Sequence, residues 1–501
     1  MSPAKKYLVA LFVVFLHFSG QITSMTGVGN RYFFRWSRND ATALVLDVFL
    51  IALVVTLLVL GLGWLVRRLN WPRVERFLGH VFLVALASGL LAAFPRFTND
   101  HPNVVQLIWM VAMAVIGFSL AWSRSKLVTW AANFCLIFSP LVFILSAQMF
   151  TWDTWHDPPQ TEFAARQAQE PKTPVFLFAF DEWSYPRSTE QDRFLPLFKN
   201  LNKLCGQSIV FRQARSPSED TKYSLPRLIY QTDLGFVWHD GNTYWVDGDK
   251  ETPATETPSL FQLARQNSYN TYLVGWHLPF SRIVGPQVDY CHSYLYHEKR
   301  LTLPGEMAFA AYRNMQYWTD PVSHRLWELL RERQFTMNWL RLNTGFRAEV
   351  RSLLADCSDN TFALFHGPLP HAPFIFNADG SYRGPCMEHE PEAYRRHLGY
   401  LDTYVGRVVD QLRAVGRFDN ALLILTSDHG WRLDRDPAFC KGPDWKRRVP
   451  LIIKLPGQQS GHVIDETFCS TQLKPLFEAV FRGQHNTRKL TRLVQDLATP
   501  P

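Results

Sequence analysis

The chain has 501 residues, of which 47% are hydrophobic, and its formal net charge is +8. Residues 1–150 hold 12 Lys and Arg against 4 Asp and Glu, which leaves 40 of each in residues 151–501. The whole positive excess therefore lies in the N-terminal part. A nucleic-acid-binding domain needs a basic patch on its own folded surface, so we expect no nucleic-acid partner.

The N-terminal part has the composition of a membrane domain. Its apolar stretches are each close to the ~20 residues that cross a bilayer, and they lie near 7–24, 43–66, 77–95, 104–122 and 127–149. The first stretch also has the charged start and short apolar core of a signal peptide. No clear cleavage site of small residues follows it, so we expect an uncleaved span.

Positive charge sets the expected orientation, because Lys and Arg favour cytoplasmic loops. Lys5 and Lys6, the arginines of 67–76, and Arg124 with Lys126 would lie inside, whereas the arginines of 31–38 oppose this rule. Five spans that start inside leave everything after residue 150 outside. We therefore expect an integral, multi-pass membrane protein with an extracytoplasmic large domain, in a bacterial inner membrane facing the periplasm.

Strand and helix patterns alternate after a polar linker at 151–172. Short apolar runs that alternate with amphipathic helices predict a mostly parallel sheet covered on both faces. A helical stretch at 300–350 interrupts this alternation as an insertion. The expected strands are 174–180, 208–214, 270–276, 361–367, 421–427 and 449–455, and the expected helices are 194–204, 259–267 and 392–415.

The expected architecture has four parts. A transmembrane domain of about five helices occupies 1–150, the linker occupies 151–172, an α/β domain occupies 173–485, and a C-terminal tail occupies 486–501. Six cysteines of the outer part allow up to three disulfides, whose pairing the sequence leaves open; they are Cys205, Cys291, Cys357, Cys386, Cys440 and Cys469.

Acidic residues directly follow two of the expected strands. Asp428-His429-Gly430 comes after ALLILTS, and Asp181-Glu182 comes after PVFLFAF. Such groups are costly to bury unless they are paired or bind a metal, and open α/β sheets place ligands beyond the carboxyl ends of their strands. Each feature alone has a structural explanation, a helix cap for Asp181 or a turn for Asp428.

Hydroxyl and basic side chains supply the other candidates. Thr221 and Ser224 lie in TKYSLP near the expected start of a helix, where a Thr is more often a cap than a nucleophile. His366 and His371 lie in HGPLPHAPF, and Lys441 precedes RRVPLII. Each of these is equally compatible with an ordinary loop residue when it is considered alone.

The order of these motifs resembles the alkaline phosphatase/sulfatase superfamily. It is most similar to the membrane-anchored branch with phosphoethanolamine transferases and lipoteichoic-acid synthases, through FAFDE, TKYSLP, PHAPF, SDHG and RVPLIIKLPG over roughly residues 174–460. The resemblance implies an alkaline-phosphatase-like fold and one divalent cation held by Asp181, Thr221, Asp428 and His429. It also implies that Thr221 is the nucleophile, with Ser224 as the runner-up.

The sequence departs from the family pattern at three points. The first acid is a Glu in many membrane transferases, so Glu182 stays open as a ligand although we favour Asp181. The glutamate that often follows DHG is replaced by Trp431-Arg432, which puts a second-metal or headgroup site in doubt. The cysteines that flank the nucleophile in the zinc-dependent transferases are absent.

The resemblance agrees with elementary chemistry. A threonine hydroxyl is a weak nucleophile at neutral pH, and coordination to a cation favours its alkoxide. His371, Lys441 and His366 are the candidates to bind the substrate, where they would hold phosphoryl oxygens and stabilise charge in the transition state. Oxygen and nitrogen ligands favour Zn²⁺ or Mn²⁺, with Ca²⁺ and Mg²⁺ also open.

We expect a transferase that moves a phospho-headgroup, of phosphoethanolamine or phosphoglycerol type, from a membrane phospholipid to an envelope glycan or glycolipid through phospho-Thr221. One alternative is a membrane-anchored sulfatase-like hydrolase or phosphodiesterase that uses water. Sulfatases mature a Cys or Ser within C/S-x-P-x-R, and here Arg227 stands one residue early after Ser224. A third alternative is a non-catalytic envelope protein of the same fold.

Overall fold

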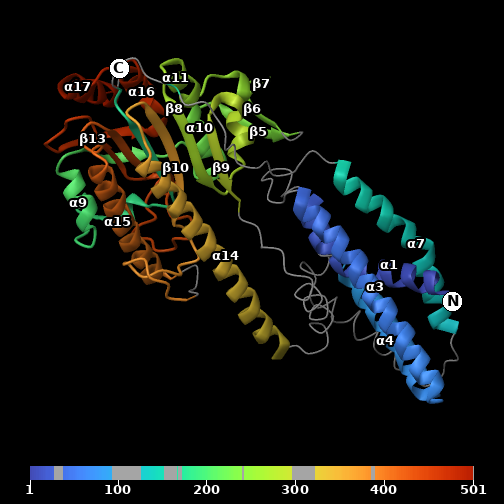
Figure 1. The fold of residues 1–501 in the computed structure, drawn as a ribbon. Coiled ribbons are helices and arrows are strands. Elements are labelled where there is room, and N and C mark those ends of the chain that lie inside the picture. Colours follow the sequence, from blue (N-terminus) through green and yellow to red (C-terminus); the bar gives the residue numbers. More distant parts are fainter. Residues whose placement is uncertain are drawn as a thin grey trace. The chain divides into compact units, whose positions relative to one another are not determined.

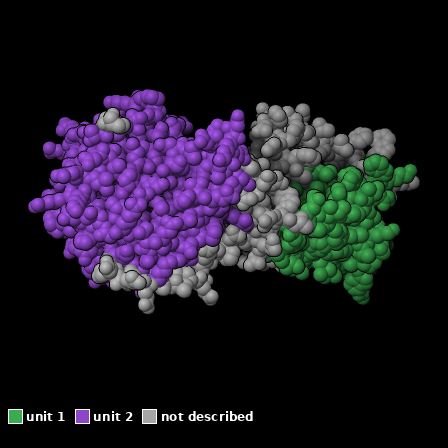
Figure 2. Space-filling model, turned by 90° about the horizontal axis from the view of Figure 1, so that it is seen from above, with its two compact units in different colours: residues 1–156, 297–331 green, residues 157–296, 332–501 purple. Residues whose placement is uncertain are grey.

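The computed structural model describes residues 1–26, 38–92, 126–151, 166, 172–239, 242–295, 322–384 and 390–499. The chain divides into two compact units, shown in different colours in Figure 2. The first consists of residues 1–156 and 297–331, and the second of residues 157–296 and 332–501.

The described part of the first unit is helical. Its helices are α1 (Pro3–Thr26), α3 (Arg38–Arg68), α4 (Pro72–Ala92) and α7 (Lys126–Thr151). Helix α1 packs against the other three, and Leu11, Phe18, Ala41 and Cys135 are fully buried among them. These four helices coincide with four of the five expected apolar stretches, and the stretch 104–122 lies outside the described residues.

Large apolar side chains also cover the outer faces of α3 and α7. Leu57 is 60% exposed and Ile137 is 72% exposed, which is typical of a surface that does not face water. Among the described helices, two are long and apolar enough to cross a membrane, at Ala41–Arg68 and Val128–Phe150. The arrangement with five spans therefore stays a prediction.

The second unit is built on an eight-stranded sheet in the order β13-β4-β12-β11-β1-β10-β8-β9. All neighbours are parallel except β12, which is antiparallel to both β11 and β4. The strands are β1 (Val175–Asp181), β4 (Ile209–Arg215), β8 (Asn270–Trp276), β9 (Tyr290–Tyr294), β10 (Thr361–Pro370), β11 (Leu422–Ser427), β12 (Leu451–Lys454) and β13 (His462–Cys469). A mostly parallel sheet, as the sequence predicts, is confirmed.

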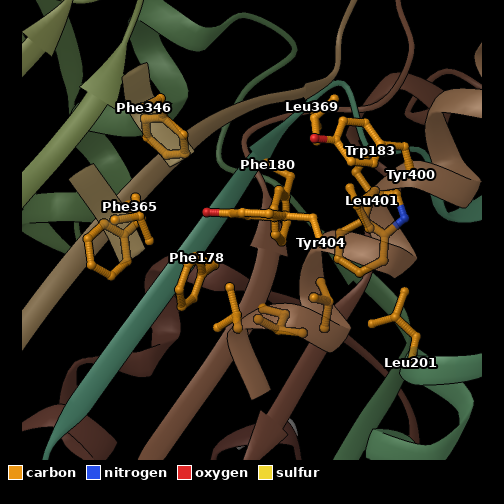
Figure 3. Close-up of a cluster of buried hydrophobic side chains, with 14 of the residues drawn as sticks. Phe178, Phe180, Trp183, Leu201, Phe346, Phe365, Leu369, Tyr400, Leu401 and Tyr404 are labelled. Carbon is orange, nitrogen blue, oxygen red and sulfur yellow. The ribbon is translucent and has the colours of Figure 1, made fainter. Parts of the chain in front are cut away.

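Helices cover both faces of this sheet (Figure 1). One face carries α9 (Lys199–Cys205), α14 (Val322–Ala355) and α15 (Pro391–Ala414). They bury a cluster of aromatic side chains that includes Phe178, Phe180, Phe346 and Tyr404 (Figure 3). Because alternate residues of a strand point to opposite faces, this cluster takes every second residue of β1.

The opposite face carries α10 (Thr221–Tyr230), α11 (Leu260–Gln266), α16 (Lys474–Phe481) and α17 (Thr487–Ala498). The ring of Phe362 on β10 contacts Phe261, Phe477 and Phe481 at centroid distances of 5.0, 6.0 and 5.3 Å. The segment 486–501, expected as a tail, contains α17, which buries Leu490 and Val494.

Smaller elements complete the second unit. The strands are the pair β2 (Thr189–Glu190) and β3 (Arg193–Phe194), and the separate sheet of β5 (Gly235–His239), β6 (Asn242–Asp247) and β7 (Lys250–Pro253). The helices are α8 (Tyr185–Ser188), α12 (Phe280–Val284), and the 3-10 turns Ala254–Glu256, Gly285–Gln287, Trp445–Arg447 and Ser470–Leu473.

The cysteines that the structure describes in this unit form no disulfide with one another; they are Cys205, Cys291, Cys357, Cys440 and Cys469. Cys386 lies outside the described residues. The disulfides that the sequence allowed are therefore not formed among the described cysteines.

Candidate metal centre

The carboxyl ends of the two central strands bring the expected acids together. Asp181 ends β1, and Asp428 directly follows β11, which pairs with β1 in parallel. His366 lies on β10, on the other side of β1, opposite Ala179. Because parallel strands end at the same edge of a sheet, these side chains share one buried site.

Ligand atoms of Asp181, Asp428 and His429 lie within 4.8 Å of one another, and the three residues are buried. Nε2 of His429 lies 3.7 Å from Oδ1 of Asp181 and 3.5 Å from Oδ2 of Asp428. Nε2 of His366 lies 3.8 Å from Oδ2 of Asp181 and 3.5 Å from Oδ2 of Asp428. We call these four residues the Asp-His cluster.

Hydrogen bonds hold one oxygen of Asp428 and leave the other directed into the cluster. Its Oδ1 accepts from the backbone N–H groups of His429, at 2.7 Å, and of Glu182, at 3.3 Å. Within the described residues, Oδ2 of Asp428, Oδ1 of Asp181 and Nε2 of His366 are buried without a hydrogen-bond partner. Such orphaned groups are costly unless a further group satisfies them.

The two histidines present lone pairs to these carboxylates. Nδ1 of His429 donates to the carbonyl of Gly430 at 2.8 Å, and Nδ1 of His366 donates to the carbonyl of Trp276 at 3.1 Å. A carbonyl only accepts, so the proton of each neutral ring sits on Nδ1 and Nε2 is unprotonated. This is the tautomer that binds a metal through Nε2.

Burial and mutual repulsion separate the pKa values of the two acids. Burial, then Asp428 and Glu182, raise the pKa of Asp181 well above its ordinary value. Burial acts in the same direction on Asp428, but His429 and His366, when their rings carry a second proton, hold the pKa of Asp428 below its ordinary value. A divalent cation among these groups would remove the repulsion and let both carboxylates ionise.

The hydroxyl of Thr221 lies at the Asp-His cluster, whereas the hydroxyl of Ser224 is hydrogen-bonded to the backbone. Oγ1 of Thr221 lies 3.1 Å from Nε2 of His429, and Thr221 is the first residue of α10. Asp220 caps that helix by accepting from the N–H of Lys222, so the capping explanation for Thr221 does not apply. Oγ of Ser224 donates to the backbone carbonyl of Asp428 at 2.5 Å.

Glu182 points to a different partner from Asp181. Its Oε1 accepts from Nε of Arg432 at 3.1 Å, and its backbone has a φ of 63°, in the left-handed region. Glu182, Asp181 and Asp428 all raise the pKa of the Arg432 guanidinium. Arg432 is thus a cation beside the cluster, a role that the sequence reasoning missed because it treated Trp431-Arg432 only as a departure.

The other expected substrate-binding residues differ in position. His366 is a member of the cluster rather than a residue of the surroundings. His371 contacts the rings of Trp276 and Trp339 at 5.1 and 5.8 Å, and Trp276 also stacks on His366 at 6.3 Å. Lys441 is exposed in the loop after β11 and makes no hydrogen bond or ion pair to the cluster within the described residues.

The residues present fit a divalent cation. Two carboxylates, an imidazole Nε2 and a hydroxyl form an oxygen and nitrogen donor set, and their free atoms converge in a buried space. His366 supplies a further Nε2 at the same place. The histidine Nδ1 atoms are each fixed by a carbonyl, as metal-ligating histidines usually require.

Comparison with known proteins agrees with this geometry. A family model described as Sulfatase matches residues 175–473, more than half of the chain. The chain belongs to the sulfatase family. It thereby belongs to the alkaline phosphatase superfamily, whose members bind a divalent metal, and the Asp-His cluster lies within the matched region.

Curated relatives match over short segments. The chain is 35% identical over 84 residues to an extracellular sulfatase SULF-1 homolog of Drosophila melanogaster, covering 16% of this chain and 8% of that protein. It is 36% identical over 69 residues to iduronate 2-sulfatase of Mus musculus, covering 13% of this chain and 12% of that protein. The chain therefore matches only a small part of the length of these relatives.

Solved structures match at low identity. The structure of Ps i-CgsB in complex with k-i-k-neocarrahexaose is 14% identical, with a TM-score of 0.44, covering 64% of this chain and 74% of that chain. The lipoteichoic acid synthase LtaP from Listeria monocytogenes is 13% identical, with a TM-score of 0.39, covering 64% and 75%.

Proposed function

We propose that this member of the sulfatase family is a metal-dependent phosphotransferase. It moves a phospho-headgroup, of phosphoethanolamine or phosphoglycerol type, from a membrane phospholipid to a hydroxyl of an envelope glycan or glycolipid. The observation that carries the proposal is the position of the Thr221 hydroxyl, 3.1 Å from Nε2 of His429 at the edge of the Asp-His cluster.

The identity of the residue at that position favours a threonine nucleophile over a matured aldehyde. Sulfatases make formylglycine from Cys or Ser, and the hydroxyl that faces the cluster belongs to Thr221. The neighbouring Ser224 is buried and donates to the carbonyl of Asp428 instead. A threonine cannot become formylglycine, so a phospho-enzyme formed on Thr221 is the better supported route.

The chain's own residues orient the reaction. Asp181, Asp428 and His429, with Thr221, are the residues that would hold the cation, and Zn²⁺ or Mn²⁺ suits their donor set best. When bound, the cation lowers the pKa of the Thr221 hydroxyl and balances the charge of the phosphodiester. Arg432, which is beside the same acids, adds a positive charge that the expected Lys441 does not supply.

Two displacements complete the transfer. Oγ1 of Thr221 gives up its proton and attacks the phosphorus, the bond from phosphorus to the glycerol oxygen of the lipid breaks, and that oxygen takes up a proton as diacylglycerol leaves. A hydroxyl of the acceptor then attacks the same phosphorus, and the bond to Thr221 breaks. The threonine hydroxyl is regenerated, and the acceptor carries the headgroup.

The first unit supports a lipid donor. Its helices α3 and α7 present exposed apolar side chains, and two described helices are long enough to cross a bilayer. We propose that they anchor the chain with the catalytic unit outside the cytoplasm, beside the lipid that donates the headgroup.

The decisive experiment compares the wild-type protein with two variants in isolated membranes that contain phospholipid labelled in its headgroup. Thr221→Ala should abolish transfer, whereas Thr232→Ala, a matched change beyond the end of α10, should retain it. Mass spectrometry of wild-type protein mixed rapidly with donor should find the headgroup phosphate on Thr221. Full transfer by Thr221→Ala would refute the mechanism.

A second candidate function is a hydrolase that uses water as the acceptor, which the sulfatases among the relatives favour. Labelled headgroup released into solution, with none on glycan or glycolipid, would replace the transferase proposal by this one. An aldehyde at Ser224 in the intact mass would establish sulfatase maturation. A non-catalytic protein would yield neither product and would bind no metal.

A further inference from the structure

A polar cavity of about 390 Å³ lies in the second unit and is lined in part by residues of β4 and β13. This volume is within the usual ~300–1,000 Å³ of small-molecule sites. Every side chain that lines it is charged or an amide, and three of the six are arginines: Asp192, Arg212, Gln213, Arg215, Arg448 and Asp465. We call it the arginine cavity.

The backbone connects this cavity to the cluster. The carbonyl of Lys446 accepts from the N–H of Gly430, next to His429, at 2.6 Å, and the carbonyl of Arg448 accepts from the N–H of Tyr185 at 3.1 Å. Arg448 therefore lies two residues after Lys446, the residue whose carbonyl binds the backbone of the DHG turn. The cavity therefore borders the segment whose backbone pairs with the DHG turn.

The cations of the cavity are only partly neutralised by the protein. Arg212 pairs with Asp465, at 2.9 Å, but the Asp465 side chain is 67% exposed. Arg215 pairs with Asp444 at 2.5 Å, with both side chains 38% exposed. Such exposed pairs contribute little. The Arg448 guanidinium lies 5.4 Å from the Tyr185 ring centroid and donates to the carbonyl of Arg212 at 3.2 Å. Within the described residues it makes no ion pair.

The Tyr185 ring that lies under Arg448 carries a buried hydroxyl. Tyr185 is 2% exposed, and its hydroxyl makes no hydrogen bond of standard geometry within the described residues. Burial, then Asp192, raise the pKa of Tyr185 to about 12, while Arg448 and Arg212 act in the opposite direction. The hydroxyl therefore keeps its proton at neutral pH.

We infer that the arginine cavity binds a second phosphate or sulfate group, carried on the sugar that accepts the headgroup. Planar guanidinium groups match the oxygens of such anions in pairs, and the carboxylates and amide of the rim match sugar hydroxyls. The identity of the bound molecule as the acceptor rests on the proposed function. Binding of the anion itself does not.

The test measures binding by isothermal calorimetry to the full chain in detergent, in an Asp428→Asn background that removes the reaction. Glucose 6-phosphate should bind and glucose should not. Arg212→Gln and Arg448→Gln should each weaken binding by about tenfold or more, the loss expected for one charge-assisted hydrogen bond. Arg488→Gln, an exposed arginine on α17, should change it less than twofold.

Three outcomes would overturn the inference: equal binding of glucose, unchanged binding by both arginine variants, or binding of phosphatidic acid in the same micelles without binding of the sugar phosphate. Melting temperatures of the variants identify any that fail to fold, and Arg212→Lys then replaces Arg212→Gln. Absence of headgroup transfer by the wild-type chain, together with sugar-phosphate binding, refutes only the proposed function. Transfer by the wild-type chain without sugar-phosphate binding refutes only the arginine cavity.

Discussion

The hydroxyl oxygen of Thr221 lies 3.1 Å from Nε2 of His429, although the two residues are 208 positions apart in the chain. Thr221 opens the helix that follows β4, and His429 follows β11, and these strands are separated in the sheet only by β12. The fold therefore brings a nucleophile candidate to a ligand candidate.

Metal content should depend on Asp428. Asp428→Asn removes the charge on the oxygen that is directed into the cluster, so we expect metal affinity to fall by more than about 100-fold, because loss of an outer-shell partner alone costs about 10–100-fold. Elemental analysis after dialysis measures this. Asp436→Asn, in the loop after the DHG turn, is the matched control and should keep full metal content. Equal metal content in Asp428→Asn would contradict the site.

Substitutions of Asp181 and of Glu182 should have different effects on metal content. Asp181 has a free oxygen in the cluster, whereas Glu182 accepts from Arg432. We expect Asp181→Asn to lose the metal and Glu182→Gln to retain most of it. Loss of metal from Glu182→Gln alone would show that the neighbouring acid is the ligand and that the choice of Asp181 is wrong.

The strand-end acids were predictable because a buried parallel strand is a continuous apolar run whose end is visible in the sequence. FAFDE and ILTSDHG show that boundary directly, and the structure places both acids where the runs stop. His366 was harder, because a histidine within an apolar run gives no sign of which neighbouring strand it will face. Its nearness to Asp181 and Asp428 follows from strand order, which local pattern does not encode.

Strand direction, edge strands and loop contacts could not be predicted from the hydrophobic pattern of the sequence. The direction of β12 is invisible in its apolar run, although it alone is antiparallel within the sheet. Strand β13 is mostly exposed along its length, so it lacks the apolar run that marks an inner strand. Arg432 and Lys441 lie in one irregular loop, and only the folded loop decides that Arg432 reaches the acids.

Glu182 and Arg432 should stabilise the protein as a coupled pair, which a double-mutant cycle of unfolding free energies can detect. Arg432→Gln leaves the Glu182 carboxylate, which is 2% exposed, without its ion-pair partner. We expect the free energy of unfolding to fall by about 1–2 kcal/mol. This is less than the ~3–5 kcal/mol of a fully buried pair, because the Arg432 side chain is 36% exposed and solvent screens its charge. The double variant with Glu182→Gln should be more stable than Arg432→Gln. Chemical unfolding measures both, and additive losses would argue against a coupled pair.

His397 should make the second unit sensitive to acid. It is fully buried, its Nε2 accepts from the N–H of Phe376 at 3.1 Å, and burial lowers the pKa of His397 to about 3. The unfolded chain binds this proton near pH 6.5, so the stability is fully present above pH 6.5 and is lost as pH falls toward 3. At pH 5 the loss is about 2 kcal/mol.

The test measures the free energy of unfolding of wild type and His397→Gln in detergent at two pH values. The stability advantage of wild type over the variant should be about 2 kcal/mol smaller at pH 5 than at pH 7.5. A stability difference for His397→Gln that is constant with pH would contradict the prediction.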